Sequence, residues 1–297
     1  MGVATSAVLP LRVWLYVAVL AGTAIAVLGL HTRSAVREDG VAAASEARRF
    51  LDHRDDRHSV RVLALGSSLL WAATPPDRYA AVPGVAWMRL TKSGGGIGHL
   101  QAVLDILDSH PPEVLVIDTN LLMAPSLSSV MDDMRVSSAA MMSDLTAPLM
   151  QHVGLYHPAA QRLSDQESAF PCTELAPGVI GKQLAALAAQ QNAAPDVPAI
   201  DTALQARLTS LAQRGVRIVL LDVQRSTRFQ LVLDATRQLW LQRWKATLPP
   251  GPPMRYLASP EIDDQRLYCD GRHMNAAGAR RFEPWWTEQL QQLARER

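Results

Sequence analysis

The sequence predicts an α/β fold with a parallel β-sheet of about five strands, preceded by an N-terminal transmembrane helix. Three observations lead to this expectation. From residue 61 onward, short apolar runs alternate with segments of helical periodicity. Several of these runs end in glycine, serine or asparagine, which favour turns. Before them, residues 13–30 form an uncharged, apolar stretch of 18 residues, which is long enough to span a bilayer.

Residues 1–33 are the predicted membrane anchor. Two alternatives stay open: an uncleaved single-pass helix, and a secretory signal peptide with small residues at 23–26 for cleavage. Arg12 precedes the apolar stretch while Arg33 and Arg37 follow it, so the distribution of positive charge gives little information on orientation. Because long domains translocate largely regardless of charge, the charge count does not decide the orientation. We expect a single-pass protein of the inner (cytoplasmic) membrane whose domain faces the periplasm or the exterior.

Residues 34–60 are rich in Arg, Asp, Glu and Ala, and we expect a helical or extended linker there. This segment contains residue types that bind metals, namely His53, Asp55, Asp56 and His58. Nothing in the sequence fixes their geometry, so a solvated charged segment is the expectation and no metal site is predicted.

The remainder, 61–297, is predicted to be one large domain. A chain of 297 residues with 48% hydrophobic content can bury a sizeable core. Its formal net charge of +1 argues against a general nucleic-acid binder, because phosphate contacts need clustered Lys and Arg. The sequence also lacks a Walker A motif and a GxGxxG motif after a strand.

Within this domain, apolar runs give the strands and helical spacing gives the helices. The predicted strands are 62–65, 85–90, 112–118, 215–223 and 254–258. The later helices are predicted at 182–192, 201–214, 228–247 and 275–297, the last with an apolar stripe that suits the core.

The α/β pattern is interrupted between about 122 and 198. Such a long interruption predicts an insertion over the carboxyl edge of the sheet, where binding loops commonly lie. This segment holds many of the methionines of the chain. Their flexible side chains suit either an acyl or glycan groove or ordinary packing.

The first strand leads into the candidate nucleophile. In the sequence RVLALGSSLL (61–70), Gly66 permits a sharp turn, and Ser67 and Ser68 open the next segment. A serine at this position lies at the carboxyl edge of the sheet, beside free backbone N–H groups. Both features are what a nucleophile and its oxyanion require.

A second stretch, YCDGRHMNAAG (268–278), supplies the partners of a serine nucleophile. Asp270 and His273 are three residues apart, so one turn brings the carboxylate close to the imidazole. A serine hydroxyl is a poor nucleophile at neutral pH. A histidine can accept its proton only in the correct tautomer and orientation, which a carboxylate fixes.

Two further polar segments follow strands. Gly94 and Gly95 lie in a glycine loop before a helical segment, which suits a phosphate, an oxyanion or only a tight turn. Asn120 follows the third strand and is either a turn former or an amide donor to an oxyanion. The two cysteines, Cys172 and Cys269, are either buried thiols or a disulfide that ties the insertion to the Asp270 turn.

The order of these blocks, Gly66-Ser67-Ser68, the glycine loop, Asn120 and Asp270-x-x-His273, resembles the SGNH, or GDSL-type, hydrolase superfamily over residues 61–285. The resemblance implies a flavodoxin-like three-layer sandwich. It also implies site roles: nucleophile Ser68, general base His273, orienting acid Asp270, and oxyanion donors Gly94 or Gly95, Asn120 and the Ser68 N–H.

Two departures from the family pattern stand out. The usual Gly-Asp-Ser is Gly-Ser-Ser here, which resembles membrane-anchored envelope members such as the teichoic acid D-alanylation protein and relatives of alginate O-acetyltransferases. The usual Gly-x-Asn-Asp is Asp118-Thr119-Asn120-Leu121, which weakens the assignment of the asparagine.

The resemblance implies serine-dependent acyl transfer at the cell envelope, by an O-acetyltransferase or an O-acetylesterase acting on an exported polysaccharide. The same triad serves both reactions, so it does not distinguish them. The implied partners are a glycan substrate, the membrane and a polytopic membrane protein that donates the acyl group. The chemistry needs no metal or organic cofactor. The alternative is an inactive scaffold that binds glycan or a membrane-bound acyltransferase.

Overall fold

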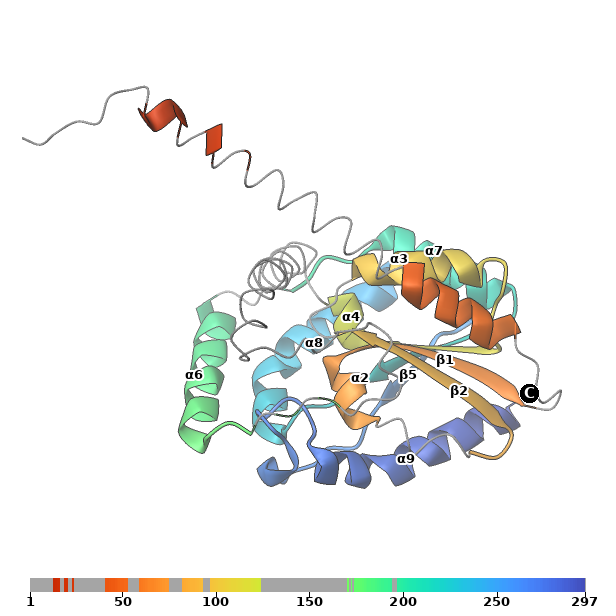
Figure 1. Ribbon diagram of the computed structural model, residues 1–297. Coiled ribbons are helices and arrows are strands. Elements are labelled where there is room, and N and C mark those ends of the chain that lie inside the picture. The colour runs from red at the N-terminus through yellow and green to blue at the C-terminus, as the bar shows by residue number, and fades with distance from the viewer. Residues whose placement is uncertain are drawn as a thin grey trace, which may run out of the picture. The chain divides into compact units, whose positions relative to one another are not determined.

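The computed structural model describes residues 13–16, 19–20, 23, 41–52, 59–74, 82–92, 97–123, 170, 172, 174–193 and 197–296 (Figure 1). The chain divides into two compact units, 1–38 with 130–159 and 39–129 with 160–297. The elements named below all belong to the second unit.

This unit is built on a five-stranded, fully parallel sheet, so the predicted α/β class is confirmed. Its strands are β1 (Val60–Ser67), β2 (Val85–Lys92), β3 (Val114–Asp118), β4 (Arg217–Asp222) and β5 (Arg255–Ala258). Their order is β2-β1-β3-β4-β5. The strands that follow β1 therefore lie on both sides of it, β2 on one side and β3, β4 and β5 on the other. The carboxyl ends of β1 and β3 flank the point where the direction of winding reverses.

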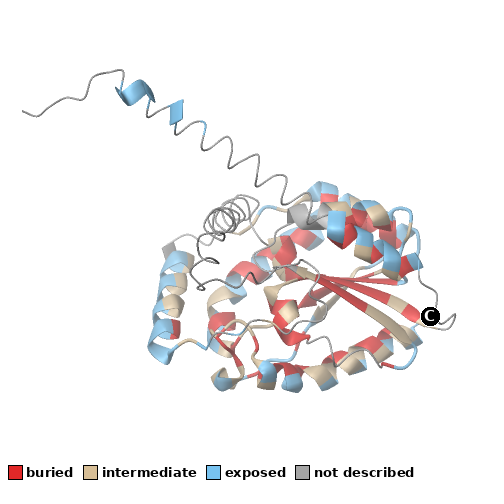
Figure 2. Cartoon of the chain, in the orientation of Figure 1, coloured by how far each residue is buried: buried red, intermediate tan, exposed pale blue. Residues whose placement is uncertain are grey.

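The strands read as apolar runs because helices cover both faces of the sheet. Every residue of β3 is buried, as expected for an interior strand of a parallel sheet. Along β1, Leu63 and Leu65 face one core cluster while Val62 and Ala64 face the other. Figure 2 shows the buried residues along the strands and on the helix sides that face the sheet.

One face is covered by a helix over 41–52, α3 (Ile97–Leu107), α7 (Thr202–Gln213) and the later part of α8 (Thr227–Thr247) (Figure 1). The two largest side chains of this cluster, Trp240 and Trp244, come from α8 and are buried there. These large rings supply much of the apolar area that stabilises this layer.

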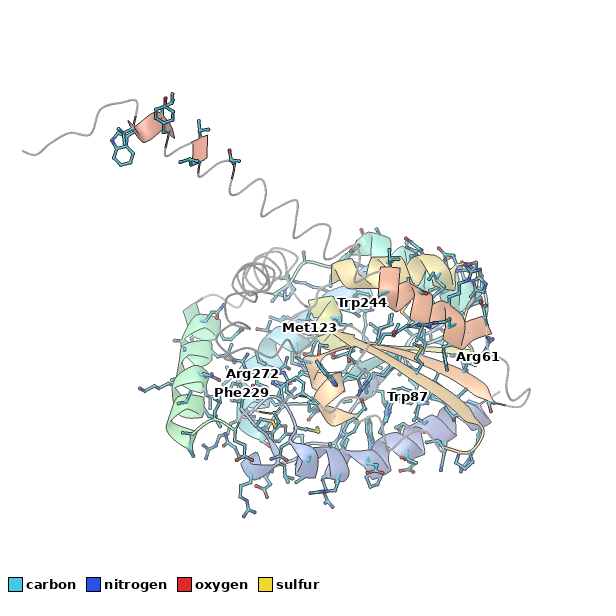
Figure 3. All side chains as sticks on the ribbon, viewed as in Figure 1. Arg61, Trp87, Met123, Phe229, Trp244 and Arg272 are labelled. Carbon is cyan, nitrogen blue, oxygen red and sulfur yellow. A yellow bond between two sulfur atoms is a disulfide. The ribbon has the colours of Figure 1, made fainter. Side chains whose placement is uncertain are left out.

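The other face is covered by α2 (Ser68–Ala73) and α9 (Ala276–Arg295). The predicted apolar stripe of the last helix is confirmed, since Trp286 and Leu290 are fully buried against the sheet. In Figure 3, Trp244 and Trp87 lie on opposite sides of the sheet, in the two core clusters.

Part of the predicted linker packs with the domain. The helix over 41–52 places Ala47 and Leu51 in the core beside the sheet. Arg61, at the start of β1, donates to the Leu51 carbonyl oxygen at 2.5 Å and pairs with Glu113 at 2.8 Å (Figure 3). The charged composition of this segment therefore describes only its outer side.

Two short helices and one long helix lie in the connections between these elements. α4 (Thr119–Met123) contains Asn120, for which a turn was one of the two expectations. The 3-10 helix η2 (Gln265–Leu267) precedes the Asp270 turn. α6 (Pro177–Ala193) extends the predicted helix of the insertion and packs against α8. The rest of the insertion lies mostly outside the described residues.

The membrane span remains a prediction. Of residues 13–30, the structure describes 13–16, 19–20 and 23, all of them helical. Among the described residues, no helix combines the length and apolarity needed to cross a bilayer.

Candidate active site

Ser68 lies at the turn from β1 into α2, at the carboxyl edge of the sheet. Ser67 caps this helix, since its Oγ accepts a hydrogen bond from the Leu69 N–H at 3.2 Å. The turn is tight: a Cβ added to Gly66 would lie 2.4 Å from the Leu70 side chain. A glycine before the two serines therefore lets the strand run directly into the helix.

The structure brings the three predicted triad residues together. The Ser68 Oγ is 2.8 Å from the His273 Nε2, although the two residues are 205 positions apart. The His273 Nδ1 is 2.8 Å from the Asp270 Oδ2. An ionised carboxylate only accepts, so Nδ1 carries the proton and Nε2 is free to accept from the serine hydroxyl.

Asp270 is held by its own turn as well as by the imidazole. Its Oδ1 accepts hydrogen bonds from the backbone N–H groups of Arg272 and His273, both at 2.9 Å. Burial raises the pKa of this carboxyl, but the hydrogen bonds from the His273 side chain and backbone outweigh burial and hold the pKa well below its usual value. Asp270 is therefore a fixed anion at neutral pH.

Gly271 allows this turn to form. Its φ of +81° is unfavourable for residues with a side chain, and an added Cβ would lie 2.4 Å from the Phe229 ring. Its carbonyl oxygen accepts from the Ser226 N–H at 3.1 Å and the Ser226 Oγ at 2.7 Å. The next residue, Arg272, places its guanidinium over the Phe229 ring at 5.2 Å (Figure 3).

The turn then leads into α9, and two residues of the 268–278 stretch, Asn275 and Gly278, shape this connection. Asn275 caps the helix, accepting from the N–H groups of Ala277 and Gly278 at 3.0 Å each. Position 278 needs a glycine because the Leu267 backbone lies close to it: an added Cβ would lie 2.2 Å from the Leu267 carbonyl oxygen. Both residues therefore fix the turn that carries His273.

A second polar network lies at the ends of β1 and β3. The Asp118 Oδ2 accepts from the Ser67 N–H and Oγ at 3.1 and 2.5 Å, and its Oδ1 accepts from the Asn120 Nδ2 at 2.6 Å. The Asn120 Oδ1 in turn accepts from the Arg225 Nη2 at 2.6 Å. The serine turn is thus hydrogen-bonded to the end of β3, which is linked through Asn120 to Arg225 in the segment after β4.

Arg225 was not identified from the sequence. Burial lowers its pKa to about 10, with the nearby Arg272 acting in the same direction and Asp118 opposing them. It therefore stays protonated at neutral pH. The only sequence signal is its place three residues after the end of β4, and a single arginine in a loop carries little information.

The predicted oxyanion donors are described in part. The neighbours of Asn120 fix its amide, because a carboxylate only accepts and a guanidinium only donates. One N–H of its Nδ2 is therefore taken by Asp118, and among the described residues the second has no acceptor. Ser68 is the first residue of α2, so its N–H has no acceptor within that helix. Gly94 and Gly95 lie outside the described residues.

The described end of the insertion is tied to the triad turn. Cys172 and Cys269 form a disulfide, so the alternative of two free thiols does not apply. Phe170, two residues before Cys172, stacks on the His273 ring with centroids 4.7 Å apart and planes at 19°. Sequence reasoning missed Phe170, because no local pattern indicates that it meets a residue so far along the chain.

No metal centre is formed by the described part of the chain, in which no group of three or more His, Cys, Asp or Glu side chains is arranged to hold an ion. The charged cluster at 53–58 lies outside it, as do His152 and His157.

Comparisons of the chain with protein-family models, curated proteins and solved structures give no match. The assignment of function therefore depends on the site itself.

Proposed function

We propose that this protein is a serine-dependent acyl-transfer enzyme of the SGNH type, with Ser68 as the nucleophile. The observation that carries the proposal is the continuous chain of contacts from the Ser68 Oγ to the His273 Nε2 and from the His273 Nδ1 to Asp270, each 2.8 Å long. The strand order, which is that of flavodoxin-like sheets, further supports it.

The first step is attack on an ester. The His273 Nε2 takes the proton of Ser68 as the Oγ bonds to the ester carbonyl carbon, and Asp270 stabilises the resulting imidazolium. The tetrahedral oxyanion is received by N–H donors, for which the Ser68 backbone and the second Asn120 Nδ2 hydrogen are the candidates in the described residues. His273 then protonates the leaving alcohol, and an acyl-Ser68 remains.

The second step decides between two activities. Water activated by His273 releases a carboxylic acid, which gives an esterase, whereas a sugar hydroxyl at the same position gives an O-acyltransferase. The residues in contact with Ser68 are the same in both. We infer an exported polysaccharide as the substrate, with the acyl group supplied by a polytopic membrane partner in the transferase case.

The cellular location is proposed on two grounds. Disulfides persist in oxidising compartments, so the Cys172–Cys269 bond favours a domain exposed to the periplasm or the exterior. The uncharged stretch at 13–30 supports a membrane tether on its N-terminal side.

The test is covalent labelling and turnover of the full chain. A fluorophosphonate is expected to label Ser68, and p-nitrophenyl acetate to be hydrolysed. Ser68→Ala should abolish labelling and lower kcat by about 10⁴-fold or more. Ser109→Ala removes an exposed serine whose hydroxyl is hydrogen-bonded to its chain neighbours Ile106 and His110, and it should change neither readout.

If folded protein shows neither labelling nor turnover, the proposal is wrong and a non-catalytic scaffold for glycan or a membrane partner replaces it. If turnover is seen, mass spectrometry of candidate oligosaccharides incubated with an acyl donor separates the two activities. Acyl groups on sugar identify a transferase, and free acid alone identifies an esterase.

A further inference from the structure

Phe170 contacts the triad residue His273, but the acyl-transfer chemistry described above gives Phe170 no role. Its ring lies against one face of the His273 imidazole, and it also contacts Trp71 of α2 edge-on, with centroids 5.4 Å apart. Trp71 lies three residues after Ser68. Phe170 thus lies between the helix that carries the nucleophile and the turn that carries the base.

The backbone beside Phe170 is fastened to that same turn in two ways. Cys172 is bonded to Cys269, and the Leu175 N–H donates to the Cys269 carbonyl oxygen at 2.8 Å. The Cys269 N–H in turn donates to the His273 carbonyl oxygen at 2.8 Å. The end of the insertion is therefore connected to the residue whose ring Phe170 covers.

The contacts of His273 explain why a cover is useful. Hydrogen bonds to Ser68 and Asp270 hold the two nitrogens at the edge of the ring, but hydrogen bonds in the ring plane resist tilting out of that plane only weakly. A phenyl ring stacked on one face blocks tilting to that side and excludes water from it. The His273 side chain keeps only 19% of its surface exposed.

We propose that Phe170 is a positioning residue that holds the His273 ring in line with Ser68, and that the Cys172–Cys269 disulfide keeps it there. This inference rests on the proposed function, since it assigns Phe170 a part in the same acyl transfer. The activity then depends on the Cys172–Cys269 bond being intact, although neither cysteine takes part in the reaction.

The first test compares variants of Phe170 in the full chain. Phe170→Ala should lower kcat by about 10- to 100-fold, the size of effect expected from a small misplacement of a catalytic group, with KM little changed. Phe170→Tyr keeps the ring and should restore most of kcat. Trp285→Ala is the matched control, because this half-buried ring has its aromatic contacts with Phe282 and Trp286 instead.

The second test asks whether the disulfide acts through Phe170. The chain has two cysteines, so reduction affects only this bond. Reducing the wild type should lower kcat by the same factor as Phe170→Ala, whereas reducing Phe170→Ala should cause little further loss. Circular dichroism under reducing conditions identifies any loss of fold. Equal losses in both proteins would overturn the role given to the disulfide.

A readout independent of turnover separates this inference from the proposed function. The His273 ring protons, observed by NMR in the full chain, should move downfield when the stacked phenyl is removed by Phe170→Ala. They should move the same way on reduction. Unchanged signals overturn the inference, whatever the activity. Shifted signals in a protein without Ser68-dependent turnover would keep the stacking and refute the enzyme.

Discussion

Replacing Gly271 by alanine should disturb the turn that carries Asp270 and His273. The residue has a φ of +81°, and the new Cβ would lie 2.4 and 2.8 Å from two atoms of the Phe229 ring. Phe229 is fully buried, so its ring has no free space into which to move. The Gly271 carbonyl oxygen is also held by Ser226, which prevents the turn from relaxing outward.

The expected loss has two parts. A residue with a Cβ in the left-handed region costs about 1–2 kcal/mol. Forcing a methyl group into the packed Phe229 ring costs about 1–3 kcal/mol more. Gly271→Ala should therefore lower the free energy of unfolding by about 2–5 kcal/mol. Because Asp270 and His273 move with the turn, labelling of Ser68 should also slow by about 100-fold.

Gly215→Ala is the matched control. Gly215 has a similar φ of +91°, but a Cβ there meets nothing within 4 Å. Its cost should be only about 1–2 kcal/mol, with labelling unchanged. Urea unfolding followed by circular dichroism measures the stability, and a fluorophosphonate time course measures Ser68. If the two variants are equally stable and equally reactive, contact with Phe229 does not constrain the turn and the reasoning is refuted.

Other perturbations test the charges of the site. Asp270→Asn should lower turnover by about 10⁴-fold, because an amide favours the wrong His273 tautomer. The folded-state pKa of Asp270 is depressed, so its stabilisation is complete above about pH 4 and is lost as the pH falls further. In urea unfolding, the advantage of the wild type over Asp270→Asn should therefore shrink only in acid. Arg225→Met leaves the Asn120 carbonyl oxygen without its donor and should reduce stability by about 1–3 kcal/mol. As a control, Arg228→Met replaces an exposed arginine in the first turn of α8 and should change stability by less than about 0.5 kcal/mol.

Local pattern was enough to place the strands and most helices. The apolar runs that became β1 to β5 are bounded by turn residues, and all five strands form where they were predicted. One difference is at Asn120, expected as a turn former or an amide donor, which lies in the helix α4 that begins at Thr119. The Asp118 carboxylate accepts locally from the Asn120 N–H at the start of this helix. It also accepts from Ser67, 51 positions away, and Arg225 donates to Asn120 from 105 positions away. Local propensity does not contain these two long-range hydrogen bonds.

The candidate site was predictable wherever its geometry is local. Asp270 and His273 are three residues apart, and their hydrogen bonds lie within one turn of chain. Phe170 and Arg225 have no such local signal. Each becomes part of the site through a contact with a residue about a hundred positions away, at His273 and Asn120 respectively.

The sequence by itself determined that apolar strands alternate with helices and that Ser68 follows the first strand. It also determined that a carboxylate lies within one turn of His273. These features arise from interactions between near neighbours, which spacing encodes. Only the tertiary structure decided that Ser68 and His273 meet and that Phe170 covers the imidazole. The physical reason is that strand order and helix packing set the distances between remote segments, and both depend on the burial of the whole core.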